Sequence, residues 1–202
     1  MPGRGGDNGA GPGRGRVDLA LLHYPVVNRQ GETIGSAVTN LDLHDLARAA
    51  RTFGVERVYV VTPYVDQQEL FREILDHWLT GPGGARNENR REALSLVRIC
   101  ADLDEAVARA TGRQGRCPLL LSTCAKEAGP VWPYAQVRRR IRAGESFLLL
   151  FGTAWGLAPR VLERADGLLP PIRGAGDYNH LSVRSAAAIV MDRLLGDDRE
   201  AI

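Results

Sequence analysis

The chain has 202 residues, 44% of them hydrophobic and 25% charged, which is the composition of an ordinary globular protein with one well-formed core. No apolar run approaches the roughly 20 residues that a membrane-spanning helix requires. The three cysteines form no CxxC pair, which argues against a disulfide scaffold and a structural zinc site. We therefore expect a cytoplasmic enzyme or binding protein without a metal site or membrane contact.

The formal net charge of +2 comes from the N-terminal residues alone. Residues 1–16 hold Arg4, Arg14, Arg16 and Asp7, so residues 17–202 are neutral. Because residues 17–202 carry no net charge, the overall charge of the protein does not indicate that it binds nucleic acid. Because the N-terminal segment is rich in glycine and poor in apolar surface, we predict a disordered tail over 1–16 and a single domain over 17–202.

Apolar strands alternate with amphipathic helices along the rest of the chain. We expect strands over Val17–Leu22, 57–62, Val97–Cys100, 119–123, 146–151 and 168–172. Between and after them we expect helices over Asn40–Phe53, 66–79, 103–110, 134–143, 159–165 and 181–195. A Gly/Asn-rich loop is expected over 81–89, followed by a further helix that ends at about residue 96. Uniformly apolar strands predict an α/β fold with a mostly parallel sheet and helices on both faces.

Two helix starts carry capping signals. Thr39 or Asn40 is placed to cap the first helix, and Gly54 to end it. Asp66, with Glu69 three residues later, predicts a capping-box variant at the start of the second helix.

Ligands of open parallel sheets bind at the carboxyl ends of the strands, so the residues that follow the strands are the candidates for a site. These candidates are His23–Pro25, Thr62–Pro63, Ser122–Thr123, Gly152–Leu157 and Ile172–His180. Common nucleotide and hydrolase motifs are missing there: the sequence has no G-x-x-x-x-G-K-[ST] and no G-x-S-x-G, and its glycine-rich stretch precedes the first strand. The informative segments are FLLLFGTAWGL (147–157) and PPIRGAGDYNH (170–180), the second of which leads into a helix rich in small residues. Glycines in such turns allow close approach of a ligand to the backbone or permit a positive φ, and an ordinary tight turn between a strand and a helix is the alternative.

In this order, the two segments resemble the C-terminal half of the SPOUT-class RNA methyltransferases. The segment DLHDLARAARTFGVERVYVVTP (42–63) is similar to the first motif of the SpoU branch, in which an asparagine and an arginine precede a Phe-Gly turn and a strand. The resemblance covers nearly all of 17–196 and is closest to stand-alone domains related to tRNA (guanine-N1) methyltransferase. It implies a C-terminal trefoil knot, S-adenosyl-L-methionine bound within the knot, methyl transfer to a nucleotide of tRNA or rRNA, and a homodimer whose active site spans both subunits.

The resemblance also implies which residues hold the cofactor, mostly through backbone groups. By position they are Ser122, Thr123, Phe151, Gly152, Thr153, Gly156, Leu157, Ile172, Arg173, Tyr178, Asn179, Leu181 and Ser182. Three positions depart from the SpoU pattern: Asp42 replaces an asparagine, Ala154 and Trp155 replace an acidic residue, and Ser182 replaces an asparagine. These departures weaken the case for ribose 2′-O specificity and leave base methylation open.

The resemblance places Arg48 at the reactive arginine of the first motif. A ring nitrogen or hydroxyl nucleophile also needs a base to take its proton. The candidate bases are Asp42, His44, Asp45, Asp177 and His180, of which Asp177 and His180 rank first because they lie in the implied cofactor loop. The predicted catalytic residues are therefore Arg48, Asp177 and His180.

RNA contact would come from local groups of arginines. One group is Arg138, Arg139, Arg140 and Arg142, and another is Arg86, Arg90 and Arg91; Tyr24, Tyr64 and Trp155 are candidates for stacking on a base. Solvated charged faces and core packing are the ordinary roles of such residues. Two other functions stay open: a catalytically silent knotted domain that binds RNA or a nucleotide, and an unrelated flavodoxin-like binding protein.

Overall fold

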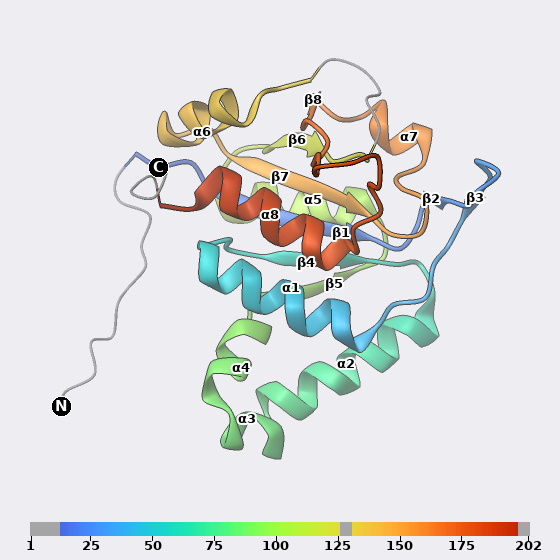
Figure 1. Cartoon of the computed structure of the whole chain (residues 1–202). Coiled ribbons are helices and arrows are strands. Elements are labelled where there is room, and N and C mark those ends of the chain that lie inside the picture. The colour runs from blue at the N-terminus through green and yellow to red at the C-terminus, as the bar shows by residue number, and fades with distance from the viewer. Residues whose placement is uncertain (1–12, 126–130, 198–202) are drawn as a thin grey trace.

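The computed structural model describes residues 13–125 and 131–197, so the predicted tail over 1–16 lies mostly outside the described residues (Figure 1). One parallel sheet has the strand order β5-β4-β1-β7-β6-β8. Its strands are β1 (Val17–Leu22), β4 (Val58–Val61), β5 (Val97–Cys100), β6 (Leu119–Ser122), β7 (Phe147–Gly152) and β8 (Gly167–Leu168). The predicted α/β fold with a mostly parallel sheet is confirmed.

Helices cover both faces of the sheet, as Figure 1 shows with α1 and α8 in front and α5 behind. The helices are α1 (Asn40–Phe53), α2 (Val65–Leu79), α3 (Pro82–Arg86), α4 (Glu88–Leu94), α5 (Leu103–Gln114), α6 (Tyr134–Arg142), α7 (Pro159–Leu162) and α8 (Val183–Leu195). Alternate strand residues face opposite layers: Leu19 and Leu149 pack in the cluster that includes α1, α2 and α8, whereas Ala20 and Leu150 pack with α5 and α7. This two-sided burial explains why the strands are apolar throughout.

The first helix begins and ends as expected. Thr39 accepts a hydrogen bond from the Asp42 N–H, and Gly54 adopts φ +74° at the end of α1. The capping box predicted at Asp66 is wrong, because α2 starts one residue earlier and its N-cap, Tyr64, makes no side-chain cap bond. Asp66 lies instead in the first turn, where a carboxylate interacts favourably with the helix dipole.

Several other boundaries differ from the prediction, and two of these differences have a physical reason in the structure. Much of the stretch 81–89, expected to be a loop, is helical, since Pro82 suits a first helical turn and Gly83 and Gly84 are buried. A Cβ on Gly84 would lie 2.1 Å from the Trp78 carbonyl oxygen, so glycine permits this packing. The last strand covers only Gly167–Leu168, because the prolines at 170 and 171 lack the N–H groups that would extend the ladder.

A short hairpin, absent from the sequence-based prediction, lies at the carboxyl edge of the sheet. It consists of β2 (Val26–Val27) and β3 (Thr33–Ile34), paired antiparallel. Val26 also forms an antiparallel bridge with Leu157, which joins the hairpin to the segment after β7. No helix in the described residues is long and apolar enough to cross a membrane. The trefoil knot stays a prediction.

Candidate cofactor and RNA site

Three loops meet at the carboxyl edge of the sheet. The Thr123 N–H donates to the Leu150 carbonyl (3.1 Å), and the Leu169 N–H donates to the Ser122 carbonyl (2.9 Å), so the ends of β6, β7 and β8 are tied together. The Asn179 side chain donates to the Ala125 carbonyl (2.8 Å), which attaches the segment before α8 to the loop after β6. The predicted cofactor residues of these three loops therefore lie at one edge.

The turn after β7 is packed against itself. A Cβ on Gly152 would lie 2.7 Å from the Leu157 nitrogen and 2.9 Å from the Gly156 carbonyl carbon, so no larger residue fits without moving the turn. Gly156 has φ +113° and Ala154 has φ +51°. The backbone of the turn itself therefore requires glycine at 152 and 156, which agrees with the tight turn that the sequence left open as an alternative to ligand approach.

The turn is also fixed to its neighbours. The Thr153 side chain donates to the Leu22 carbonyl at the end of β1 (3.2 Å). The Trp155 N–H donates to the Val27 carbonyl (3.0 Å), and the Val27 N–H donates to the Gly156 carbonyl (2.9 Å). Bonds on both sides of Trp155 hold this stretch on the β2–β3 hairpin.

The segment from 170 to 182 is more open. Ile172 packs against the core, whereas Tyr178 and Leu181 are exposed. Among the described residues, none forms a hydrogen bond with the backbone of 174–178, where two glycines leave open space around the chain. Ser182 caps α8, its hydroxyl accepting a hydrogen bond from the Ser185 N–H (3.3 Å). Exposed backbone N–H and C=O groups that form no bond within the described residues can accept a ligand such as an adenine ring.

A buried histidine supports the site; the sequence marked its position, directly after a strand, but indicated no role for it. His23 follows β1 and is fully buried, with Nδ1 3.0 Å from the Ser36 hydroxyl, which in turn contacts the Thr153 hydroxyl. Its Nε2 is buried without a hydrogen-bond partner among the described residues. Burial lowers the pKa of His23 to about 4, so the ring is neutral at pH 7. A single histidine after a strand has no sequence pattern that would reveal this network.

The first-motif residues lie along α1. Asp42 is buried in an ion pair with Arg184 of α8 (2.7 Å) and accepts a hydrogen bond from the Thr39 hydroxyl (2.7 Å), which favours a structural role. Arg48 is exposed, and within the described residues it forms no hydrogen bond or ion pair with the three loops. Burial, followed by the charges of Arg90 and Arg48, lowers the pKa of His44, which lies one helical turn before Arg48 on α1. No side-chain bond thus joins Arg48 to Asp177 or His180 in the described part of the chain.

The other two predicted catalytic residues lie in the exposed segment before α8. Asp177 is exposed. The His180 ring lies between two aromatic rings, with centroids 6.4 Å from Trp155 and 5.3 Å from Tyr178. Their roles as acid or base stay predictions.

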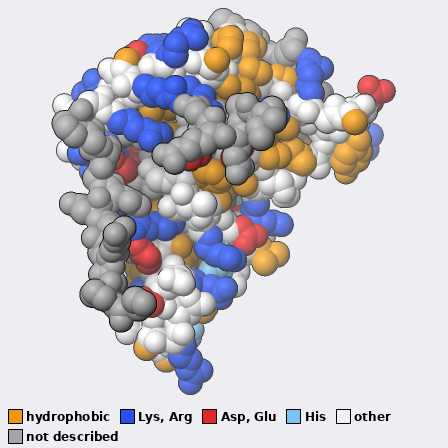
Figure 2. Space-filling model, turned by 60° about the vertical axis from the view of Figure 1, so that its left-hand side comes forward, with side chains coloured by type: hydrophobic (Ala, Val, Ile, Leu, Met, Phe, Trp, Pro, Cys, Tyr) orange, Lys and Arg blue, Asp and Glu red, His pale blue; other side chains and the backbone are white. Residues whose placement is uncertain are grey.

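The arginines predicted to contact RNA are partly engaged within the protein. Arg140 pairs with Glu145 (2.6 Å) and lies 4.2 Å from the Trp132 ring centroid. Arg90 lies 4.8 Å from the Trp78 ring centroid, and Arg91 pairs with Glu88 (2.8 Å). In Figure 2, basic side chains occur in several separate groups on the visible face. Contact with RNA through these arginines stays a prediction.

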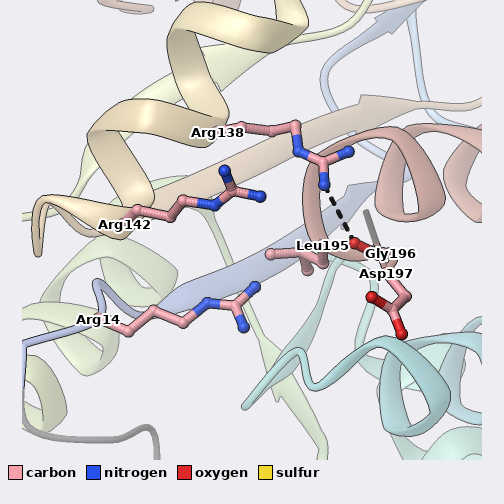
Figure 3. Close-up of a pocket in the computed structure, with 6 residues that line it drawn as sticks. All are labelled: Arg14, Arg138, Arg142, Leu195, Gly196 and Asp197. Carbon is pink, nitrogen blue, oxygen red and sulfur yellow. Dashed lines mark hydrogen bonds between the residues drawn. The ribbon is translucent and has the colours of Figure 1, made fainter. Parts of the chain in front are cut away.

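A basic cavity of about 450 Å³ lies at the far end of α8 from the three loops (Figure 3). Its lining residues are Arg14, Arg138, Arg142, Leu195, Gly196 and Asp197. Arg138 donates to the carbonyls of Arg193 (3.2 Å) and Gly196 (3.1 Å), and so caps the C-terminal end of α8. This cavity is therefore distinct from the candidate cofactor site.

Known proteins share the sequence and the fold of this chain. Residues 16–196 match a family described as SAM-dependent RNA methyltransferase. A tRNA (guanine-N(1)-)-methyltransferase from Oleidesulfovibrio alaskensis is 48% identical over 186 residues, 92% of this chain but 43% of that protein. An uncharacterized protein from Aquifex aeolicus is 39% identical over 91% of this chain and 90% of its own length. The SpoU methyltransferase AviRb from Streptomyces viridochromogenes superposes with TM-score 0.56 at 18% identity, over 91% of this chain and 60% of that one.

The chain belongs to the family of SAM-dependent RNA methyltransferases. Its fold is shared with SpoU-type enzymes, one of which has been solved with AdoMet bound. The expected family, fold class and cofactor are thus confirmed. The chain spans less than half the length of the curated tRNA methyltransferase that it matches.

Proposed function

We propose that this protein transfers a methyl group from S-adenosyl-L-methionine to a nucleotide of a structured RNA, with tRNA as the first substrate to test. The observation that carries the proposal is the meeting of the loops after β6, β7 and β8 at one edge of the sheet. The name of the 48% identical relative supports tRNA as the substrate class, although the match covers only part of that protein.

The residues of the three loops would hold the methyl donor mostly through the backbone. The exposed backbone of 174–178 is suited to an adenine ring, and Ser122 and Thr123, at the end of β6, would lie beside it. When bound, S-adenosyl-L-methionine supplies an electrophilic methyl group on a sulfonium. Alignment of the nucleophile with that group is the main task of the protein, and positioning of this kind can contribute roughly 7–11 kcal/mol at best.

The chemistry also needs a proton acceptor and a group that orients the nucleotide. Asp177 and His180 are our candidates for the acceptor, because both lie in the segment that borders the donor loops. Arg48 forms no bond with the three loops in the described residues, so we propose that it reaches the site from a second subunit of a homodimer. A cytoplasmic location belongs to the same proposal.

Transfer of tritium from labelled S-adenosyl-L-methionine to RNA tests the activity. Total RNA from cells that lack this gene is the substrate, because its target positions are unmodified. We expect incorporation into the tRNA fraction. The alternative, a catalytically silent RNA-binding domain, gains support from Ala154 and Trp155 in place of an acidic residue, and it predicts RNA binding without incorporation.

A further inference from the structure

Four side chains from three separate loops form a cluster of rings and one cation beside the candidate cofactor site. They are Arg29, Trp155, Tyr178 and His180, which we call the ring cluster. The Arg29 guanidinium carbon lies 6.0 Å from the Trp155 ring centroid, and the His180 ring lies edge-on to both Trp155 and Tyr178. Trp155 is 58% exposed and Tyr178 is 81% exposed. Large rings this exposed contribute little to the core.

The backbone around Trp155 presents its ring in a defined place. Ala154 adopts φ +51°, in a region that residues other than glycine seldom occupy, and Gly156 adopts φ +113°. Hydrogen bonds to Val27 from both sides of Trp155 fix the turn on the hairpin. The φ of Ala154 is energetically unfavourable, and the turn that contains it exposes the Trp155 ring to solvent. Packing within the protein does not explain this exposure, and a bound ligand would.

We propose that the ring cluster stacks on a base of the RNA substrate. The proposal rests on the proposed methyltransferase function and names the surface that receives the nucleotide. Unpaired bases stack on aromatic rings, and an arginine over a ring adds a cation–π contribution and attracts the phosphate backbone. Trp155 lies in the same turn as Thr153 and Gly156, so a base stacked on it lies next to the candidate donor site.

The test compares Trp155→Ala, Trp155→Phe and a control, Leu70→Ala, in the full chain. Leu70 is a 46% exposed apolar residue of α2, outside the three loops. The probe is unmodified total tRNA, and its dissociation constant is measured at fixed salt by filter binding. Calorimetric titration with S-adenosyl-L-methionine and sedimentation equilibrium are run on the same samples. Loss of one stacked base weakens RNA affinity about 5- to 150-fold, the range that alanine substitution of stacking residues gives.

We expect that weakening for Trp155→Ala, recovery of most of the affinity in Trp155→Phe and wild-type affinity in Leu70→Ala. Affinity for S-adenosyl-L-methionine stays at the wild-type value in Leu70→Ala, and in Trp155→Ala it falls less than the RNA affinity does. Wild-type RNA affinity in Trp155→Ala, or no RNA affinity in the unsubstituted protein, would overturn the proposal. A fall in molecular mass for Trp155→Ala also overturns it and assigns the cluster to a subunit interface. Failure of the methyltransferase proposal would be seen in other measurements: the protein would not bind S-adenosyl-L-methionine in the calorimetric titration, or would not transfer tritium to RNA.

Discussion

Arg184 at the start of α8 binds Asp42 at the start of α1, with Nη1 2.7 Å from Oδ1. Its Nε also lies 3.3 Å from Asp45 Oδ2. The contact joins α1, which carries the first motif, to α8, which directly follows the open segment 170–182 of the candidate cofactor site. The end of that segment is therefore anchored through α8 to α1.

Removing this anchor is predicted to lower stability. Arg184→Met leaves the Asp42 carboxylate buried without its cation, which costs about 1–3 kcal/mol of unfolding free energy. The matched control is Arg109→Met, which removes an ion pair between half-exposed partners one helical turn apart and costs about 0.5 kcal/mol or less. Urea unfolding measures both. Equal effects of the two substitutions would contradict the structural role of the Arg184–Asp42 pair.

His23 predicts a pH dependence of stability. Its folded pKa of about 4 lies below the value of 6.5 for an unfolded chain, so the unfolded state binds more protons between these values. Stability therefore rises with pH through this window and falls as the pH is lowered. At pH 4 the loss attributable to His23 is about 3 kcal/mol relative to pH 7.

The check compares urea unfolding of the wild type with that of His23→Asn at pH 4 and pH 7. Asparagine has no titrating group, and its amide can still reach the Ser36 hydroxyl that contacts His23 Nδ1. The wild type should lose more stability than the variant on acidification. Parallel pH profiles of the two proteins would rule out a neutral, buried His23.

Gly152→Ala is predicted to displace the turn after β7. The added Cβ meets backbone atoms of Gly156 and Leu157 at under 3.0 Å, and backbone cannot give way as a flexible side chain can. We expect a loss of about 1–3 kcal/mol, the range of an overpacked site. Gly112→Ala, within α5, is the matched control: nothing lies within 4 Å of its Cβ, so helix propensity gives a gain of about 0.5–1 kcal/mol. Thermal unfolding of the two variants should thus shift in opposite directions.

Asn179→Ala is predicted to weaken donor binding with little effect on stability. Within the described part of the chain, the bond that the substitution removes is the one to the Ala125 carbonyl, which holds the open segment against the loop after β6. A bond of this kind contributes about 0.5–1.5 kcal/mol, or roughly 2- to 10-fold in affinity for S-adenosyl-L-methionine. Calorimetry measures the affinity, and an unchanged value would show that this attachment does not shape the site.

Most of the sheet could be predicted from the sequence, because strands buried on both faces read as continuous apolar runs. β1 and α1 have the predicted bounds. The ends of α1 could be predicted because Thr39 and Gly54 are capping residues that act locally. The positions of Gly152 and Gly156 were also recognisable, since glycine after a buried strand signals an unusual turn.

Other features depend on contacts between distant segments. The β2–β3 hairpin has only two residues in each strand, and its place is set by bonds from Val27 to the turn that holds Trp155. Helix α3 forms in a glycine-rich stretch because Gly84 packs on the Trp78 backbone. The pairing of Asp42 with Arg184 joins residues far apart in sequence, so no local sequence pattern predicts it.

Titration of the purified protein with S-adenosyl-L-methionine tests the central claim most directly. The account predicts saturable binding near one site per chain, greatly weakened by Gly152→Ala and unchanged by Gly112→Ala, because only the first substitution displaces the turn of the candidate site. Absence of binding, or equal binding by the Gly152→Ala variant, would contradict the assignment of the three loops as the methyl-donor site.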